Sequence, residues 1–438
     1  ALYFERLLMG VSGFAGHARY LDWEAGHRGE DGSATFAMLA IVLGWEEALL
    51  SVDARIKTAW DAALSTAGSG PASDPVATVL HDAFERATQR MMVQKIGPTA
   101  TSSPPAPTVQ MAFCIDVRSE VFRRALESVD PHVETIGFAG FFGVPIEAVT
   151  IDGEDSGARC PVLLKPAATV EDGHGATAPG ASAAAKAEKV GERLKSRLLG
   201  RIWGYYKSAA VASFGFVEAL GLTFGGRLVE AQFRRSSGRS SNLDAASPSL
   251  TVEHSHGKRL GIDPETKLQM AAGILRGMSL TTSFAPIVVL AGHGSHTVNN
   301  PYGSALECGA CGGHKGDLNA RTAAAILNDS AVRAGLPALG IALPQETVFV
   351  AALHDTTTDE VALFDTDAAK SQHPKAMDNL ARSLSEAGRR ARQERARHLG
   401  IGAPESVDSD ITRRSRDWSE VRPEWGLAGC AAFVRRPA

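Results

Sequence analysis

The stretch Val109–Arg118, with the sequence VQMAFCIDVR, places an apolar run directly before a cysteine, an aspartate and an arginine. Such a run predicts a buried β-strand, and alternate side chains of a strand point to the same side. Cys114, Asp116 and Arg118 can therefore converge where the strand ends. A thiolate binds zinc, a carboxylate can complete a tetrahedral site, and a neighbouring guanidinium can draw that carboxylate away to admit water. The same residues also fit a buried cysteine followed by an aspartate that caps a helix.

A second region carries further candidate ligands. The apolar run Ala285–Ala291 is followed by residues 292–296 (GHGSH), and residues 308–314 read CGACGGH. Ligand sites in α/β proteins form beyond the carboxyl ends of parallel strands, so two apolar strands that end in metal-type residues favour a zinc site. The spacing of Cys308, Cys311 and His314 is also typical of a closed structural zinc knuckle, and the residues alone leave both interpretations open.

The pattern of apolar runs predicts an α/β fold with a mainly parallel β-sheet, flanking helices and a helical amino-terminal part. A predicted helix follows the first strand, which gives a βαβ unit with parallel strands. The predicted strands are residues 109–115, 133–138, 285–291 and 347–353.

Composition divides the chain into four segments. We expect a helical amino-terminal region, a proline-containing linker, an α/β zinc-binding core with a long insertion, and a helical or irregular carboxyl-terminal region. These are residues 1–96, 97–108, 109–365 with the insertion at 167–242, and 366–438. Inside the insertion, a basic stretch precedes the apolar residues 203–222, a pattern that fits either a membrane-facing or partner-facing helix or an ordinary core helix.

Charge and cysteine content exclude several classes of protein. The formal net charge is -4 with 21% charged residues, which gives no support to a nucleic-acid role, because phosphate binding needs a concentrated basic surface. Five unevenly spaced cysteines do not form a disulfide framework, so a reducing compartment with metal-bound thiolates is the simpler interpretation. We find no uninterrupted apolar run of the ~18 residues that a membrane span needs.

Several stretches together resemble the DabA family, the zinc subunit of a bacterial membrane-associated inorganic carbon pump. They are residues 113–120 (FCIDVRSE), 136–143 (IGFAGFFG), 292–295 (GHGS), 307–313 (ECGACGG) and 417–428 (DWSEVRPEWGLA). The motifs recur in the family's order over most of the chain.

The resemblance implies a ligand set and a catalytic pair. The zinc ligands it implies are Cys114, Asp116, His293 and Cys308, and Arg118 would form an Asp–Arg dyad with Asp116. Such a dyad is a feature of β-carbonic anhydrases, whose site the family's site resembles. In those enzymes the histidine and second cysteine lie much closer in sequence, so the likeness is one of site geometry.

The resemblance also implies a function. The family's zinc subunit converts CO2 to bicarbonate in one direction, in complex with DabB, a membrane subunit similar to cation-translocating antiporters. We therefore expect a peripheral protein at the cytoplasmic face of the bacterial inner membrane, with CO2 hydration only inside the complex. Family members are usually longer, and this chain opens at Ala1 without an initiator Met, so we expect a carboxyl-terminal portion or a short member.

Three alternatives remain from the residues alone. A zinc-dependent hydrolase would use Glu307 or Asp355 as a general base, a non-catalytic scaffold would carry structural zinc, and a soluble anhydrase would need no partner. His354, beside Asp355, fits either a group that orients the site or a histidine that satisfies polar groups at a strand end.

Overall fold

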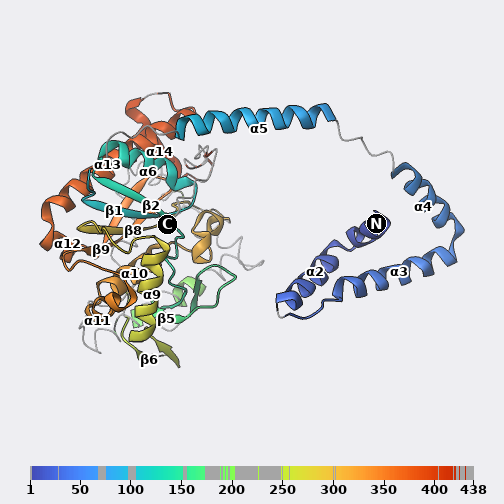
Figure 1. Cartoon of the computed structure of the whole chain (residues 1–438), viewed down its shortest axis with the longest axis horizontal. Helices are drawn as coiled ribbons and strands as arrows, with labels where there is room; N and C mark the ends of the chain where they lie inside the picture. Colours follow the sequence, from blue (N-terminus) through green and yellow to red (C-terminus); the bar gives the residue numbers. More distant parts are fainter. Residues whose placement is uncertain are drawn as a thin grey trace. The chain divides into compact units, whose positions relative to one another are not determined.

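The chain divides into two compact units. The computed structural model describes residues 2–27, 29–67, 75–96, 105–150, 155–172, 250–255, 257–298, 302–402 and 404–417, with isolated positions at 188, 191, 192, 194, 195, 198–202, 225, 248, 300, 419, 420, 424 and 430. Contacts group the chain into Ala1–Ser103 and Pro104–Ala438 (Figure 1). The apolar stretch 203–222 and most of the predicted insertion lie outside the described residues.

The amino-terminal unit is built from helices. They are α1 (Leu2–Gly10), α2 (Ser12–His27), α3 (Ala34–Val52), α4 (Ala54–Ala67) and α5 (Pro75–Ile96). In the described part of the chain, α3 is the one helix that is long and apolar enough to cross a bilayer by length and composition, although two glutamates interrupt its apolar run. None of its residues is buried.

A five-stranded sheet forms the centre of the second unit, in the order β10-β9-β8-β1-β2. The strands are β1 (Val109–Cys114), β2 (Val133–Phe138), β8 (Ile287–Gly294), β9 (Val348–Asp355) and β10 (Glu360–Phe364). The first four pair in parallel, and β10 adds an antiparallel edge. The sequence predicted the four parallel strands to within a few residues, but not the edge strand.

Helices cover both faces of this sheet (Figure 1). One face carries α6 (Arg118–Val129) and α13 (Pro374–His398), whose apolar side chains pack on the odd-numbered residues of β1 and β8. The other carries α9 (Pro264–Gly277) and α10 (Asp317–Asn328), packed on the even-numbered ones. Strands buried on both faces are apolar throughout, which explains the continuous runs in the sequence.

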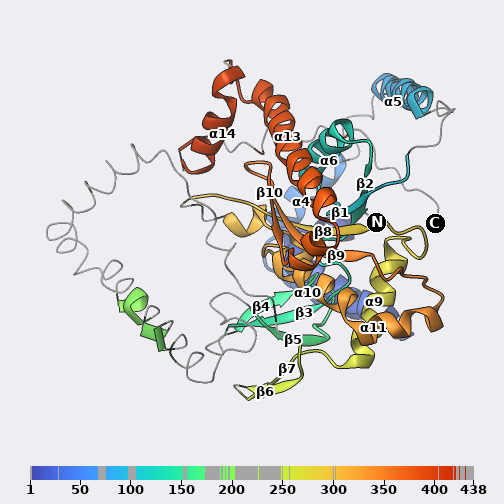
Figure 2. The same ribbon diagram turned by 90° about the vertical axis from the view of Figure 1, so that its left-hand side faces the viewer.

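Shorter elements surround the sheet. Figure 2 shows β3, β4 and β5 grouped on the side of the sheet opposite to α13. The remaining elements are β3 (Ile146–Val149), β4 (Asp155–Arg159), β5 (Ala168–Glu171), β6 (Glu253–Ser255), β7 (Lys258–Leu260), η2 (Gly303–Leu306), η3 (Gly309–Cys311), α11 (Ser330–Gly335), η4 (Leu336–Leu339), α12 (Asp367–Gln372), η5 (Pro404–Ser406) and α14 (Val407–Ser415).

The sheet places the predicted site residues at one edge. Strands β1 and β8 are neighbours and run in the same direction, so their carboxyl ends lie together. Cys114 ends β1, and β8 continues past the predicted end to include His293, because its ladder with β9 stays in register as far as Gly294. The segment that carries Cys308 follows β8 through η2.

Candidate metal centre

Three buried side chains meet at the carboxyl ends of β1 and β8. The donor atoms of Cys114, His293 and Cys308 all lie within 4.8 Å of one another. The two sulfur atoms are 4.0 Å apart. Two thiols and an imidazole form a donor set that suits zinc, and a tetrahedral site would need one further ligand.

His293 is in the state that a metal ligand requires. Its side chain is 1% exposed, and among the described residues neither ring nitrogen has a hydrogen-bond partner. Burial lowers the pKa of His293 to about 4, so the ring is neutral at pH 7 with a lone pair available. Because buried polar groups are normally paired, an unpaired buried imidazole beside two thiols indicates that a bound group completes the site.

The two cysteines hold their protons until a metal displaces them. The hydrogen bond with Cys308, together with burial, raises the pKa of Cys114. For Cys308, the hydrogen bond with Cys114 lowers the pKa, but contact with Cys311 and burial outweigh it and bring the value to about 12. Metals bind the thiolate, so binding must release these protons.

A glycine after β2 leaves room for the two sulfur atoms. A Cβ atom on Gly140 would lie 2.7 Å from the sulfur atoms of both Cys114 and Cys308. The side chain of any larger residue would collide with both thiols. The sequence placed Gly140 in a family-like stretch without assigning it to the site, because its proximity depends on how the loop after β2 returns across the end of β1.

Asp116 lies beside this group and is held by Arg118. The Nε and Nη2 atoms of Arg118 donate to the two carboxylate oxygens of Asp116 at 2.8 and 2.9 Å. The Oδ2 atom of Asp116 is 3.9 Å from Nδ1 of His293. Burial would raise the pKa of Asp116, but the hydrogen bonds and the charge of Arg118 lower it, so Asp116 is ionised. The predicted Asp–Arg pair is present, and ligation by Asp116 remains a prediction.

The sequence analysis missed a carboxylate behind Arg118. Glu424 is fully buried, and its Oε2 atom lies 3.3 Å from Nη1 of Arg118. The same Nη1 atom donates to the carbonyl of Leu306 at 2.8 Å, which ties the arginine to the segment that carries Cys308. Glu424 falls in the family-like stretch 417–428, but its sequence distance from the other residues gave no reason to place it here.

Cys311 and His314 do not join the metal-type group. Within the part of the chain that the structure describes, that group comprises Cys114, His293 and Cys308. Cys311 is buried next to it and donates to the carbonyl of Gly140 at 3.3 Å. His314 contacts Cys308 through its backbone. The arrangement therefore favours the convergent strand-end site over a knuckle built on residues 308–314.

The candidate general bases of a hydrolase are engaged in local hydrogen bonds. Glu307 accepts from the backbone and hydroxyl of Ser295 at 3.1 and 3.2 Å. Asp355 accepts from the backbone of Thr357 and Thr358 at 2.9 and 3.2 Å. Burial raises the pKa of both carboxyl groups. Both side chains thus hold the backbone near the strand ends, which weakens the hydrolase alternative.

His354 lies in a buried polar network rather than at the metal-type group. Its ring nitrogens are 3.2 Å from Asp359 and 3.4 Å from Ser119. Asp359 pairs with Arg395 at 2.7 Å, and Arg395 donates to the backbone carbonyl of Arg118 at 2.8 Å. The network thereby fixes the start of α6, where Arg118 stands.

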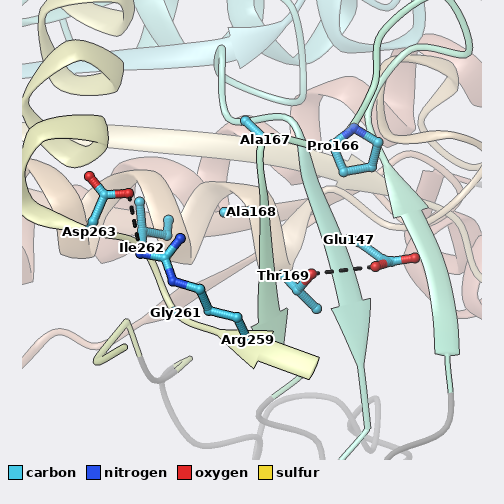
Figure 3. A pocket seen from close by; sticks show the side chains of 9 residues that line it. All are labelled: Glu147, Pro166, Ala167, Ala168, Thr169, Arg259, Gly261, Ile262 and Asp263. Atoms are coloured by element: carbon cyan, nitrogen blue, oxygen red, sulfur yellow. Dashed lines mark hydrogen bonds and ion pairs between the residues drawn. The ribbon is translucent and has the colours of Figure 1, made fainter. Parts of the chain in front are cut away.

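A surface pocket elsewhere in the unit shares no residue with the metal-type group. Figure 3 shows it between β5 and the chain around β7, where Thr169 faces Glu147 and Arg259 faces Asp263. It contains no cysteine or histidine, so we assign the metal chemistry to the strand ends.

Fold and site together define an α/β protein with a cysteine- and histidine-lined metal-type centre at the ends of parallel strands. The family described as "Probable inorganic carbon transporter subunit DabA" matches residues 1–437. The chain belongs to the DabA family.

Relatives that carry the same name support this assignment. One from Chloroflexus aggregans is 43% identical over 99% of this chain and 54% of its own length. One from Rhodospirillum centenum is 45% identical over 99% of this chain and 52% of its own. The chain thus spans about half the length of these relatives. No solved structure matches it.

Single substitutions should separate ligands from neighbours. We expect Cys114→Ala and Cys308→Ala to lose most bound zinc, because each removes a thiolate, whereas Cys311→Ala should retain it. Zinc per chain can be measured by elemental analysis, with circular dichroism to confirm folding. Full zinc content in both Cys114→Ala and Cys308→Ala would contradict the assignment.

A methyl group at position 140 should impair the centre without changing a donor atom. We expect Gly140→Ala to weaken zinc binding by about 10-fold or more, as expected when a ligand's supporting geometry is disturbed. Competition with a chromophoric chelator measures this affinity. Gly309→Ala is the matched control, since a Cβ there meets no atom within 4 Å. Equal affinities for the two variants would show that Gly140 does not shape the site.

Proposed function

We propose that this chain is the zinc-binding part of an energy-coupled inorganic carbon transporter, which converts CO2 to bicarbonate in one direction. The observation that carries the proposal is the unpaired, neutral His293 beside two thiols, with the Asp116–Arg118 pair next to it. The relatives' names, which describe subunits of an inorganic carbon transporter, support the substrate class.

Zinc would be held by Cys114, His293 and Cys308, with Asp116 as the fourth ligand. Zinc is a Lewis acid that lowers the pKa of a coordinated water to about 7. The role of Asp116 would be to occupy or vacate the fourth position. Away from the metal, Arg118 can bind the carboxylate of Asp116 through two hydrogen bonds. This bidentate pair is the geometry found in the structure.

The exchange of Asp116 between the metal and Arg118 would open and close the site. Conversion of CO2 in one direction requires such a gate. A freely reversible anhydrase only equilibrates CO2 and bicarbonate, whereas a site whose opening is tied to another process can favour one direction. We propose that a DabB-type membrane subunit supplies that process through a cation gradient. The protein would then be peripheral, on the cytoplasmic face of the inner membrane.

Removal of the Arg118 side chain should abolish transport while leaving metal binding intact. We expect Arg118→Ala to keep its zinc but to abolish growth at ambient CO2 when the full protein is produced with its membrane partner in a host that depends on it. Without Arg118, Asp116 has no alternative partner and stays on the metal. Arg124→Ala is the control, since Arg124 is an exposed arginine on the same helix. Normal growth with Arg118→Ala would contradict the gate.

The purified chain should be a poor anhydrase by itself. We expect little CO2 hydration in a stopped-flow pH-indicator assay, because Asp116 would occupy the fourth position when no partner drives it off. Turnover typical of an ordinary carbonic anhydrase would instead favour a soluble, ungated enzyme.

A further inference from the structure

The guanidinium of Arg118 is contacted by carboxylates on two sides. The carboxylate of Asp116 accepts hydrogen bonds from Nε and Nη2 of Arg118. On the other side, Oε2 of Glu424 lies 3.3 Å from Nη1. The hydroxyl of Thr356 donates to Oε2 of Glu424 at 2.8 Å, with that of Thr357 at 3.5 Å. Glu424 is therefore anchored to the turn after β9, independently of Asp116.

The single positive charge of Arg118 faces two carboxylates, those of Asp116 and Glu424. Arg118 is 8% exposed and an arginine does not lose its proton in a protein, so its charge needs a carboxylate partner. Two carboxylates are present for this one guanidinium. Either of them can leave only if the other remains charged and in place.

We infer that Glu424 is the reserve counter-ion of Arg118, which keeps the guanidinium compensated when Asp116 moves to the metal. This inference rests on the proposed function, in which Asp116 exchanges between Arg118 and zinc. Glu424 is thus a positioning residue that acts on the metal through the arginine. Its charge sets how readily Asp116 leaves its seat.

The charge of Glu424 depends on Arg118. Burial and the nearby carboxyl of Asp355 raise the pKa of Glu424, and they outweigh the hydrogen bond from Thr356 and the charge of Arg118, which lower it. Arg118 is thus the favourable charge acting on Glu424, opposed by burial and Asp355. When Asp116 moves to the metal, Glu424 is the anionic partner that Arg118 keeps. The guanidinium then attracts Glu424 without competition from Asp116.

The alternative is that Glu424 merely fastens the carboxyl-terminal segment to β9. An anchor of that kind depends on hydrogen bonds, which a glutamine can largely supply. A counter-ion depends on charge, which aspartate keeps and glutamine lacks. The two roles therefore predict opposite rankings for Glu424→Asp and Glu424→Gln.

Ligand exchange on cobalt distinguishes these roles. The Co2+-loaded chain is titrated with thiocyanate, an external ligand for an open metal position, and its visible absorption is followed. In Glu424→Gln, Asp116 must stay on Arg118, so the fourth position remains open. We expect thiocyanate to bind about 10-fold more tightly than to the parent, as when a binding-competent state rises from about 10% to nearly full population.

Two further variants complete the test. Glu424→Asp keeps the charge and should return the thiocyanate affinity to within about threefold of the parent, a shift smaller than one 10-fold step. Glu360→Gln, which neutralises an exposed glutamate on β10, should behave as the parent. This ranking, with cobalt content unchanged in all four proteins, would support the inference.

Other results would overturn it. Equal thiocyanate affinities for Glu424→Gln and the parent would show that the charge has no influence on Asp116. Equal tightening in Glu424→Gln and Glu424→Asp would point to packing, and loss of folding or cobalt in Glu424→Gln would make the residue structural. Because the readout is ligation rather than turnover, a purified chain that hydrates CO2 as fast as an ordinary carbonic anhydrase would refute the proposed gated function while leaving this result interpretable.

Discussion

The parallel pairing of β1 with β8 is the constraint on which the rest of the centre depends. These strands come from segments far apart in the sequence, and their ladder pairs Phe113 with Ala291 immediately before Cys114 and Gly292. A shift of the register by one residue would turn His293 to the other face of the sheet. Helices buried against both faces hold the register, so the apolar core fixes the distance between a thiol and an imidazole.

Burial then determines the chemistry of the groups that meet there. His293 stays neutral because it is desolvated. Burial also helps the thiols keep their protons, together with the contact with Cys308 for Cys114 and the contact with Cys311 for Cys308. Asp116 stays charged because Arg118 offsets its burial. The site thus combines three neutral donor groups with one anion, Asp116. A metal position that a protein side chain can open or close requires this combination.

A network of paired charges surrounds the group formed by Cys114, His293 and Cys308. Arg118 is held by Asp116 and Glu424 through its side chain and by Arg395 through its backbone carbonyl. Arg395 is itself fully buried and paired with Asp359. Removing one member of such a network leaves an uncompensated buried charge, a more costly change than breaking an exposed ion pair.

The chain, which spans about half the length of its relatives, carries Cys114, His293 and Cys308 together at one edge of the sheet. Within this chain, the second unit alone contains the centre, its arginine seat and the carboxylate behind that seat.

The sequence by itself determined the apolar runs that become strands and the cysteine and histidine at their ends, because strand periodicity and burial leave a direct trace in composition. It also supplied the Asp116–Arg118 pair, since two residues of spacing keep both side chains within reach. Tertiary structure alone decided that Gly140 lies against both thiols, that Cys311 lies outside the group of Cys114, His293 and Cys308, and that Glu424 contacts Arg118. These contacts depend on how loops and the carboxyl-terminal segment return across the sheet edge, and long-range packing of that kind has no periodicity in the sequence.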